Sequence, residues 1–387
     1  MKKLIFIIAL VIGTQTMQGQ QLSDLSFGTS QTFELVTWNI EWFPKSGQTT
    51  IDSVRTIIEA LNVDVLALQE ISDTNDFKTV IDALPDYEVF FETNYYAGLA
   101  YVYNKTTVNI QNYYEIYTTS NYWNYFPRAP KVLELTFNGE EFIIINNHLK
   151  CCGDGTLLAG VASDEENRRY QAMLLLRNYI DTNFPNKNVI VTGDLNDILT
   201  DGELNNVFKD VINDDENYLF ADMSIAEGSI FNWSYPNWPS HLDHILITDE
   251  LFDEFNKSTT VTETIRIGDY MQGGFNDYDA KISDHRPVGL KFEPNYVSTN
   301  QLVSIDDVLT VFPNPSKGYL MINIKNPTQN AFIEIYHLNG QKLKTIALQD
   351  GQTNIDYNFN DLPNGVYGLQ YFSDNQSVVM QKIVILK

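Results

Sequence analysis

The order of apolar and amphipathic segments between residues 33 and 293 constrains the fold most. Gln48–Leu61 has apolar residues at helical spacing, and Val63–Gln69 follows it as a run suited to burial on both faces. A second helix is expected from an N-cap at Ser163 to about Asp181, before a buried strand at Asn188–Thr192. Further strands are expected at Tyr87–Glu92, Leu99–Tyr103, Lys131–Phe137, Glu141–Asn146, Leu242–Thr248 and Pro287–Phe292. Two sheets packed face to face with helices outside is the simplest layered arrangement of these elements.

Polar residues that could carry chemistry recur where these strands meet loops. Each occurrence alone is typical of a cap or a turn, but six in order are hard to explain as turn chemistry. The six segments are Trp38-Asn39-Ile40, Leu68-Gln69-Glu70, Asn147-His148-Leu149, Gly193-Asp194-Leu195-Asn196, Leu242-Asp243-His244-Ile245 and Ser283-Asp284-His285-Arg286-Pro287.

This ordered set resembles the motifs of the endonuclease/exonuclease/phosphatase superfamily, which includes pancreatic-type deoxyribonucleases, abasic-site endonucleases, neutral sphingomyelinases and inositol polyphosphate phosphatases. The resemblance implies a four-layer α/β sandwich of two mostly antiparallel sheets, over residues 30–293, with the active site between the sheets at one end. It also implies a divalent metal held by Asn39, Glu70 and Asp284, and a catalytic set formed by His148, Asp194, Asn196, Asp243 and His285.

By this resemblance Asp194 prepares the attacking water, and Asn196 hydrogen-bonds the phosphoryl oxygens. Asp243 fixes the His285 ring, and His148 contacts the scissile phosphate. The roles agree with elementary chemistry, because an anionic diester needs a cation and a positioned base. Mg²⁺ needs only one or two protein carboxylates, and Mn²⁺ is a possible substitute.

Two departures from the pancreatic-type pattern stand out. The stretch Tyr95–Tyr101 has no acidic residue, which leaves the partner of His148 open. Arg128 resembles a phosphate-contacting arginine, but Ala129 stands where a glutamate is expected. Lys150 is a second candidate for substrate binding and equally fits a solvated loop.

The other histidines of the Ser240–Ile245 segment carry no role from this resemblance. Strand alternation turns His244 away from Asp243, so we expect His244 to be structural, and His241 stays undecided.

The first 19 residues predict a secretory signal peptide. Lys2 and Lys3 precede the apolar run Leu4–Ile12, and cleavage is expected near Gly19 or Gln20. No stretch reaches the length needed to span a bilayer, so stable membrane insertion is not expected. The only cysteines, Cys151 and Cys152, are adjacent; a strained bridge between them and two free thiols are both open.

A polar linker is expected at residues 294–307, followed by short strands and turns over residues 308–387. The segments Val311-Phe312-Pro313-Asn314-Pro315, Ile333–Tyr336 and Gly365-Val366-Tyr367 resemble the sorting domain of the type IX secretion system. This resemblance implies a small all-β sandwich, recognition by the secretion machinery, and export to the medium or cell surface. A generic immunoglobulin-like or carbohydrate-binding module is the alternative.

The charge balance limits how the protein can hold its substrate. With 25 basic and 50 acidic residues, the net charge of −25 argues against binding nucleic acid through a broad basic face. A bound metal can still supply local positive charge. We expect a monomeric Mg²⁺-dependent phosphodiesterase, in the first place a nuclease acting on DNA or RNA. A lipid or small-molecule phosphoesterase is the main alternative, and a catalytically inactive adhesin the remote one.

Overall fold

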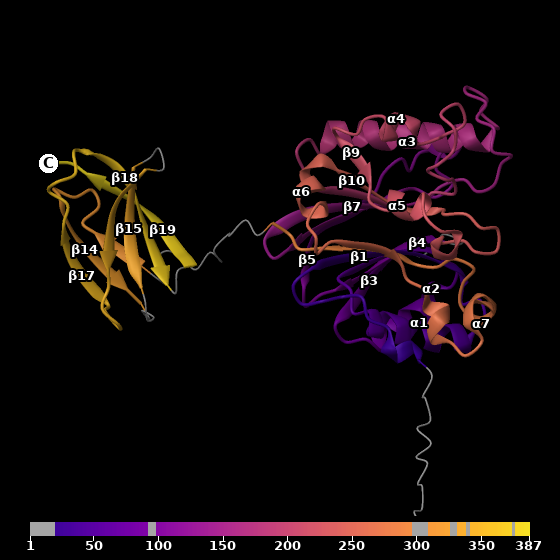
Figure 1. Cartoon of the computed structure of the whole chain (residues 1–387), viewed down its shortest axis with the longest axis horizontal. Coiled ribbons are helices and arrows are strands. Elements are labelled where there is room, and N and C mark those ends of the chain that lie inside the picture. The colour runs from indigo at the N-terminus through magenta and orange to yellow at the C-terminus, as the bar shows by residue number, and fades with distance from the viewer. Residues whose placement is uncertain (1–19, 92–97, 296–308, 326–330, 338–340, 374–375) are drawn as a thin grey trace, which may run out of the picture. The chain divides into compact units, whose positions relative to one another are not determined.

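The computed structural model describes residues 20–91, 98–295, 309–325, 331–337, 341–373 and 376–387. The expected signal peptide, most of the expected linker and residues 95–97 lie outside these ranges. The chain divides after Asn295 into two compact units. Each unit is described by itself (Figure 1).

The first sheet of the larger unit has six strands in the order β11-β12-β1-β2-β4-β3. Its central pair, β1 and β2, is parallel, and the other neighbouring pairs are antiparallel. The strands are β1 (Phe33–Phe43), β2 (Val65–Ile71), β3 (Tyr87–Phe91), β4 (Gly98–Asn104), β11 (Val261–Thr264) and β12 (Val288–Phe292).

The second sheet repeats this plan with the order β5-β6-β7-β8-β10-β9. Here β7 and β8 are the parallel central pair, between antiparallel neighbours. The strands are β5 (Val108–Glu115), β6 (Lys131–Phe137), β7 (Glu140–His148), β8 (Val189–Asp194), β9 (Tyr218–Phe220) and β10 (Asp243–Thr248).

The two parallel pairs are each joined by a long helix. Helix α1 (Gln48–Leu61) connects β1 to β2, as its apolar spacing predicts, and α3 (Glu165–Asn183) connects β7 to β8. The N-cap of α3 is Asp164, whose side chain accepts from the Asn167 amide. The expected N-cap at Ser163 is therefore wrong by one residue. Shorter helices are α2 (Thr74–Asp82), α4 (Lys209–Ile212), α5 (Met223–Ala226), α6 (Phe252–Phe255) and α7 (Gly274–Lys281).

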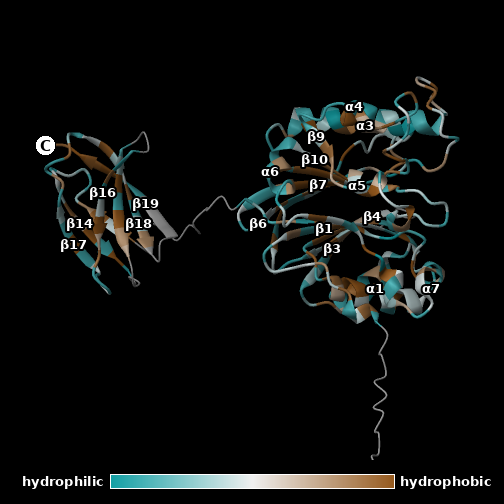
Figure 2. Ribbon diagram, viewed as in Figure 1, coloured by the Kyte–Doolittle hydropathy of each residue, from teal (hydrophilic) through white to brown (hydrophobic). Residues whose placement is uncertain are grey.

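Two sheets and the helices on their outer faces give this unit four layers, with a buried apolar cluster at each of the three junctions; Figure 2 colours the ribbon by hydropathy. One buried cluster lies between the sheets, where the rings of Phe33 (β1) and Phe142 (β7) stack with centroids 4.6 Å apart. A second cluster packs α1 and α2 against the outer face of the first sheet, and a third packs α3 against the second sheet. The four-layer sandwich expected from the sequence is thus confirmed.

The smaller unit is entirely β in its described residues. It has a sheet of three strands, β13-β14-β17, and one of four, β16-β15-β18-β19, around one buried apolar cluster. The strands are β13 (Leu309–Phe312), β14 (Tyr319–Ile324), β15 (Phe332–His337), β16 (Lys342–Ala347), β17 (Asn354–Asn358), β18 (Gly365–Ser373) and β19 (Gln376–Ile385). Among the described helices of the chain, none is long and apolar enough to cross a bilayer.

Candidate active site

A pocket of about 360 Å³ opens where the ends of the two parallel pairs meet. It brings together seven of the ten site residues expected from the sequence. It is lined by Asn39, Glu41, Trp42, Glu70, His148, Cys151, Cys152, Asp194, Asn196, Tyr235, Leu242, Asp284 and His285. Asp243 lies directly behind His285, while Arg128 and Lys150 are not part of the lining.

The first sheet supplies carboxylates through an irregularity between β1 and β2. The pairing register shifts between Asn39 and Phe43, and Glu41, Trp42 and Glu70 adopt positive φ values of 36°, 50° and 64°. Such backbone conformations are costly for residues other than glycine and persist where the surroundings impose them. The Trp42 amide donates to Glu70 Oε2 at 3.1 Å, which fixes the Glu70 side chain at the pocket.

Glu41 is a site residue that the sequence analysis missed. Its Oε2 accepts from the Asp284 amide at 2.8 Å and from Lys45 Nζ. Burial and the Glu41 charge raise the pKa of Asp284 to about 6, against the opposing effect of His285. The signal available in the sequence was an acidic residue two positions beyond Asn39, but nothing local distinguishes it from a surface carboxylate.

The second sheet supplies His148 and Asp194 as the paired last residues of β7 and β8. His148 Nε2 lies 3.5 Å from Asp194 Oδ2 and 3.9 Å from Glu70 Oε1. Its buried Nδ1 has no hydrogen-bond partner among the described residues. Burial, together with the charges of Arg128 and His285, lowers the pKa of His148 well below the usual range.

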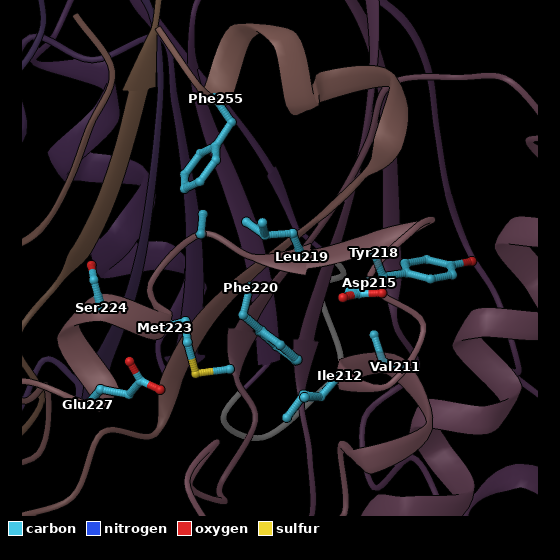
Figure 3. Close-up of a pocket in the computed structure, with 11 residues that line it drawn as sticks. Val211, Ile212, Asp215, Tyr218, Leu219, Phe220, Met223, Ser224, Glu227 and Phe255 are labelled. Carbon is cyan, nitrogen blue, oxygen red and sulfur yellow. The ribbon is translucent and has the colours of Figure 1, made fainter. Parts of the chain in front are cut away.

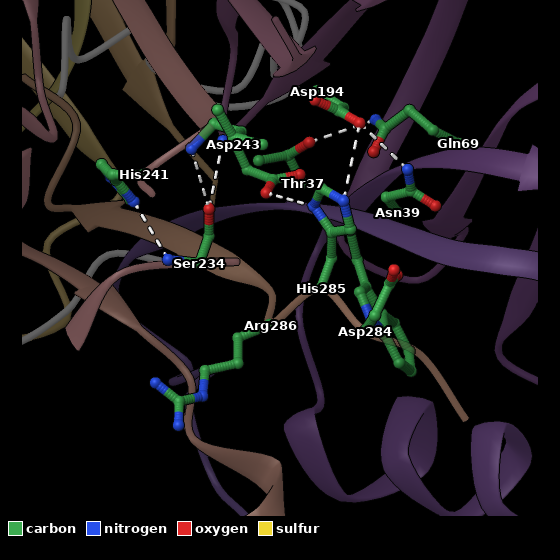
Figure 4. Close-up of polar contacts among 12 residues, drawn as sticks. Thr37, Asn39, Gln69, Asp194, Ser234, His241, Asp243, Asp284, His285 and Arg286 are labelled. Atoms are coloured by element: carbon green, nitrogen blue, oxygen red, sulfur yellow. Dashed lines mark hydrogen bonds and ion pairs between the residues drawn. The ribbon is translucent and has the colours of Figure 1, made fainter. Parts of the chain in front are cut away.

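Asp243 and His285 form a close, buried polar contact (Figure 4). Asp243 Oδ2 lies 2.7 Å from His285 Nδ1, and the carboxylate is completely buried. Burial disfavours the charged ring, but Asp243 and Asp194 outweigh it and raise the pKa of His285 to about 10. The pairing of these residues therefore favours an imidazolium at neutral pH. The ring of Tyr235, another residue missed in the sequence, packs 4.8 Å from the His285 ring.

Asp194 occupies the centre of the site. Its Oδ2 accepts from Asn39 Nδ2 at 3.0 Å and lies 3.8 Å from His285 Nε2. Burial raises the pKa of Asp194 to about 7, although the His285 charge acts in the opposite direction. A buried carboxylate with this pKa, between two imidazoles, is suited to accept a proton near neutral pH.

Buried amides tie the two sheets together just below the pocket. Gln69 Nε2 donates to Asn146 Oδ1 at 2.8 Å, and Asn146 Nδ2 donates to the Leu68 and Ala100 carbonyls at 3.0 and 3.1 Å. Because these groups are buried, each lost contact would leave an unpaired polar atom. The amides therefore hold the sheet ends, and the catalytic groups on them, at a fixed separation.

Three expected substrate contacts lie at or near the rim. Asn196 has φ 55° and donates from Nδ2 to the Leu149 carbonyl at 3.2 Å, which leaves its second amide hydrogen available. Burial lowers the pKa of Arg128, against the attraction of Glu70 and Asp194, which shows that its charge acts on the site. Lys150 Nζ turns back to the Cys151 carbonyl at 2.9 Å. Cys151 and Cys152 are exposed free thiols.

The carboxylates of this pocket fit a hard divalent cation. Glu41, Glu70 and Asp284 line the same pocket with oxygen donors, and burial together with the Glu41 charge raises the pKa of Asp284. Oxygen donors of this kind are what Mg²⁺ prefers. A second hollow of about 420 Å³ lies beside β9 (Figure 3), but its lining is mainly apolar and carries no cluster of catalytic groups.

Two family models match parts of this chain. A family model described as "Endonuclease/Exonuclease/phosphatase family" matches residues 36–285, and one described as "Secretion system C-terminal sorting domain" matches residues 310–386. No curated protein matches the chain.

Solved structures show the likeness in fold. D. rerio TDP2, solved with a single strand DNA product, is 14% identical, with a TM-score of 0.51, over 68% of this chain and 99% of that one. The human Nocturnin catalytic domain is 17% identical, with a TM-score of 0.47, over 67% and 94%. A family protein from Bacteroides vulgatus is 16% identical, with a TM-score of 0.47, over 68% and 98%.

Proposed function

Because the chain belongs to the endonuclease/exonuclease/phosphatase family, we propose that it is a secreted, Mg²⁺-dependent phosphodiesterase whose substrate is extracellular DNA. Members of the family hydrolyse phosphoester bonds, and the C-terminal sorting domain directs export to the cell surface or beyond. The expected signal peptide would start this export. The observation that carries the proposal is the Asp243–His285–Asp194 set, facing three carboxylates across one pocket.

In the proposed reaction, water attacks phosphorus and one P–O bond breaks, giving a phosphomonoester and an alkoxide, which takes a proton from solvent water to become an alcohol. Asp194 accepts the proton of the water, and Asn39 holds Asp194 in place through their 3.0 Å contact. The His285 imidazolium, kept charged by Asp243, donates from Nε2 to a phosphoryl oxygen. Asn196 donates its second amide hydrogen to the same group.

Glu70 and Asp284, with Glu41 beside them, would hold the metal. When bound, Mg²⁺ supplies positive charge that offsets the charge developing on the phosphoryl group. His148 faces both Asp194 and Glu70, so we assign it a contact with the scissile phosphate.

DNA is favoured as the substrate by the residues near the rim. Trp42 lines the pocket with 45% of its surface exposed, and Trp123 is 63% exposed on the loop before Arg128. Exposed aromatic rings can stack on bases, and Arg128 adds a positive charge that acts on the site. The related fold of D. rerio TDP2 accommodates a single strand DNA product.

The test is an activity panel with and without Mg²⁺. The substrates are duplex DNA, single-stranded DNA, RNA, sphingomyelin and bis-p-nitrophenyl phosphate, and EDTA should abolish cleavage. Arg128→Ala should raise KM or lower kcat on DNA while sparing the small diester, which is too short to reach that side chain. Hydrolysis of sphingomyelin without cleavage of any nucleic acid would refute DNA as the substrate, and inactivity on every diester would refute the phosphodiesterase itself.

A further inference from the structure

Behind the pocket, a completely buried carboxylate faces two buried histidines. Asp222 Oδ2 lies 2.6 Å from His244 Nδ1 and 3.1 Å from His241 Nε2, and Asp222 Oδ1 accepts from the Ile245 amide at 2.8 Å. Asp222, His241 and His244 are each 1% exposed or less. None of the three lines the pocket, and none touches the groups assigned to the reaction.

The hydrogen-bond partners fix the protonation of His244. Its Nε2 lies 2.8 Å from the Asp197 carbonyl, which can only accept, so Nε2 carries a proton. Its Nδ1 faces the Asp222 carboxylate, which also accepts. The ring therefore donates at both nitrogens. Although burial acts in the opposite direction, Asp222 raises the pKa of His244, in keeping with an ion pair.

His241 is neutral by the same reasoning. Its Nδ1 accepts from the Ser234 amide at 3.2 Å, so the proton of the ring is on Nε2, which lies 3.1 Å from Asp222 Oδ2 without the alignment of a hydrogen bond. The three side chains could otherwise be considered as metal ligands. A metal on His241 Nε2 would displace that proton and leave both ring nitrogens without one, so His241, as bonded to Ser234, does not fit a metal ligand.

His244 reaches the site through Asp197. The Asp197 carbonyl that accepts from His244 follows Asn196 directly and is three residues beyond Asp194. Asp197 Oδ2 also accepts from Arg169 Nε at 2.8 Å, and Arg169 Nη1 donates to the Lys150 and Cys152 carbonyls at 2.7 Å. The hydrogen bonds from His244 and Arg169 to Asp197, and from Arg169 to Lys150 and Cys152, form the first arm of this network. This arm fixes the segments that follow both β8 and β7.

His241 reaches the other side of the site through Ser234. Ser234 Oγ accepts from the Leu242 and Asp243 amides at 3.1 and 3.2 Å (Figure 4). The Ser234 carbonyl accepts from the Arg286 amide at 2.7 Å, one residue beyond His285. The second arm thus fixes the backbone of Asp243 and of His285 together.

We propose that His241 and His244, oriented by Asp222, are positioning residues that hold Asp194 and Asn196 in register with Asp243 and His285. His244 acts through its Nε2 on one segment, and His241 acts through its Nδ1 on the other. The inference rests on the proposed function, because it assigns a role in phosphodiester hydrolysis to residues that touch no substrate.

Asparagine and glutamine substitutions test the two ring nitrogens of each histidine one at a time. An asparagine amide reaches as far as Nδ1, and a glutamine amide as far as Nε2. His244→Gln therefore keeps the contact with Asp197, whereas His244→Asn keeps the contact with Asp222. At His241 the order is reversed, since His241→Asn keeps Ser234 and His241→Gln keeps Asp222.

The expected result is a crossed pattern in the full-length protein, with bis-p-nitrophenyl phosphate as the substrate. His244→Asn and His241→Gln should lower kcat by up to about 10²-fold at nearly constant KM, as small displacements of catalytic groups do. His244→Gln and His241→Asn should keep kcat within about threefold but melt at lower temperature, because Asp222 loses a partner. The loss of activity and the loss of stability should therefore fall on different variants.

A matched control lies on the same two strands. Thr248 Oγ1, at the far end of β10, accepts from the Val189 amide of β8 at 3.2 Å and donates to the Lys187 carbonyl at 3.1 Å. Thr248→Val should lower the melting temperature and leave kcat unchanged.

The positioning role is overturned if kcat follows the melting temperature across the four variants, or if all four keep the wild-type kcat. If the two variants at one histidine do not fold, the two variants at the other histidine are judged by the same criterion. If the wild-type protein hydrolyses no diester, the proposed function is wrong, but this result alone does not decide the positioning role of the two histidines. The inference is then decided by the NMR signal of the proton between Asp243 and His285, which His244→Asn and His241→Gln alone should displace.

Discussion

Replacing Gly193 by alanine should damage stability and catalysis together. Gly193 precedes Asp194 on β8, pairs with Asn147 on β7, and has φ 139°, which residues with a side chain rarely adopt. A Cβ on Gly193 would lie 1.9 Å from the Asn147 carbonyl oxygen, against 3.4 Å or more in an ordinary contact. Relieving this overlap requires a movement of about 1.5 Å between the strands that carry His148 and Asp194.

The magnitude follows from these two costs. The backbone conformation costs about 1–3 kcal/mol and the overlap a further 1–3 kcal/mol, so the free energy of unfolding should fall by about 2–6 kcal/mol. In a domain of this size that corresponds to a melting temperature lower by roughly 4–24 °C. A displacement of about 1 Å at Asp194 should also lower kcat by about 10²-fold.

Calorimetry of the purified protein and steady-state kinetics on bis-p-nitrophenyl phosphate measure both effects. Gly202→Ala is the matched control, because a Cβ at Gly202 meets nothing within 4 Å. Gly193→Ala with a melting temperature and kcat close to those of Gly202→Ala would refute the claim that close approach of β7 and β8 sets the site.

Four further changes have defined outcomes. His285→Ala should lower kcat by at least about 10²-fold with the fold intact, by circular dichroism, because the ring acts on the phosphate. Glu70→Gln should raise the Mg²⁺ concentration needed for half-maximal activity, and titration that matches the wild type would remove Glu70 from the metal site. Burial, with the charge of Asp64, raises the pKa of Glu34 to about 8, so the stability from its protonated form is full below pH 4.5 and is lost as pH rises to 8. Glu34→Gln should therefore flatten the fall in melting temperature between pH 5 and 8, and an unchanged slope would contradict this. A protein truncated after Glu293 should keep the wild-type kcat on the small diester, and loss of activity would give the sorting domain a part in the site.

The catalytic layers could be predicted because their signals are local. The apolar spacing of Gln48–Leu61 specifies a helix of those bounds. The runs expected as strands before Glu70, His148 and Asp194 are strands in the structure, although β7 and β8 extend two residues further than expected, to His148 and Asp194. The N-cap of α3 was misplaced because Ser163 and Asp164 are both good caps, and only the backbone decides which side chain faces the free amides.

The missed residues lack such signals. Glu41 lines the pocket because the β1 backbone adopts a positive φ where the pairing register of β1 and β2 shifts. No residue type in this part of the sequence predicts such a conformation. Asp222 meets His244 across 22 residues of sequence, and His244 meets Asp197 across 47. Contacts of this kind depend on which strands become neighbours in the sheet, so they emerge only from the complete topology.

The repeated plan of the two sheets has a mechanical consequence. Asn39 and Glu70 belong to one parallel pair, and His148 and Asp194 belong to the other, so the width of the apolar core sets the width of the site. The stacked rings of Phe33 and Phe142 act as a spacer within that core. A larger or smaller side chain at Phe142 would change the distance between the two sheets. It would therefore also change the distance from Asp194 to a substrate held on the opposite sheet.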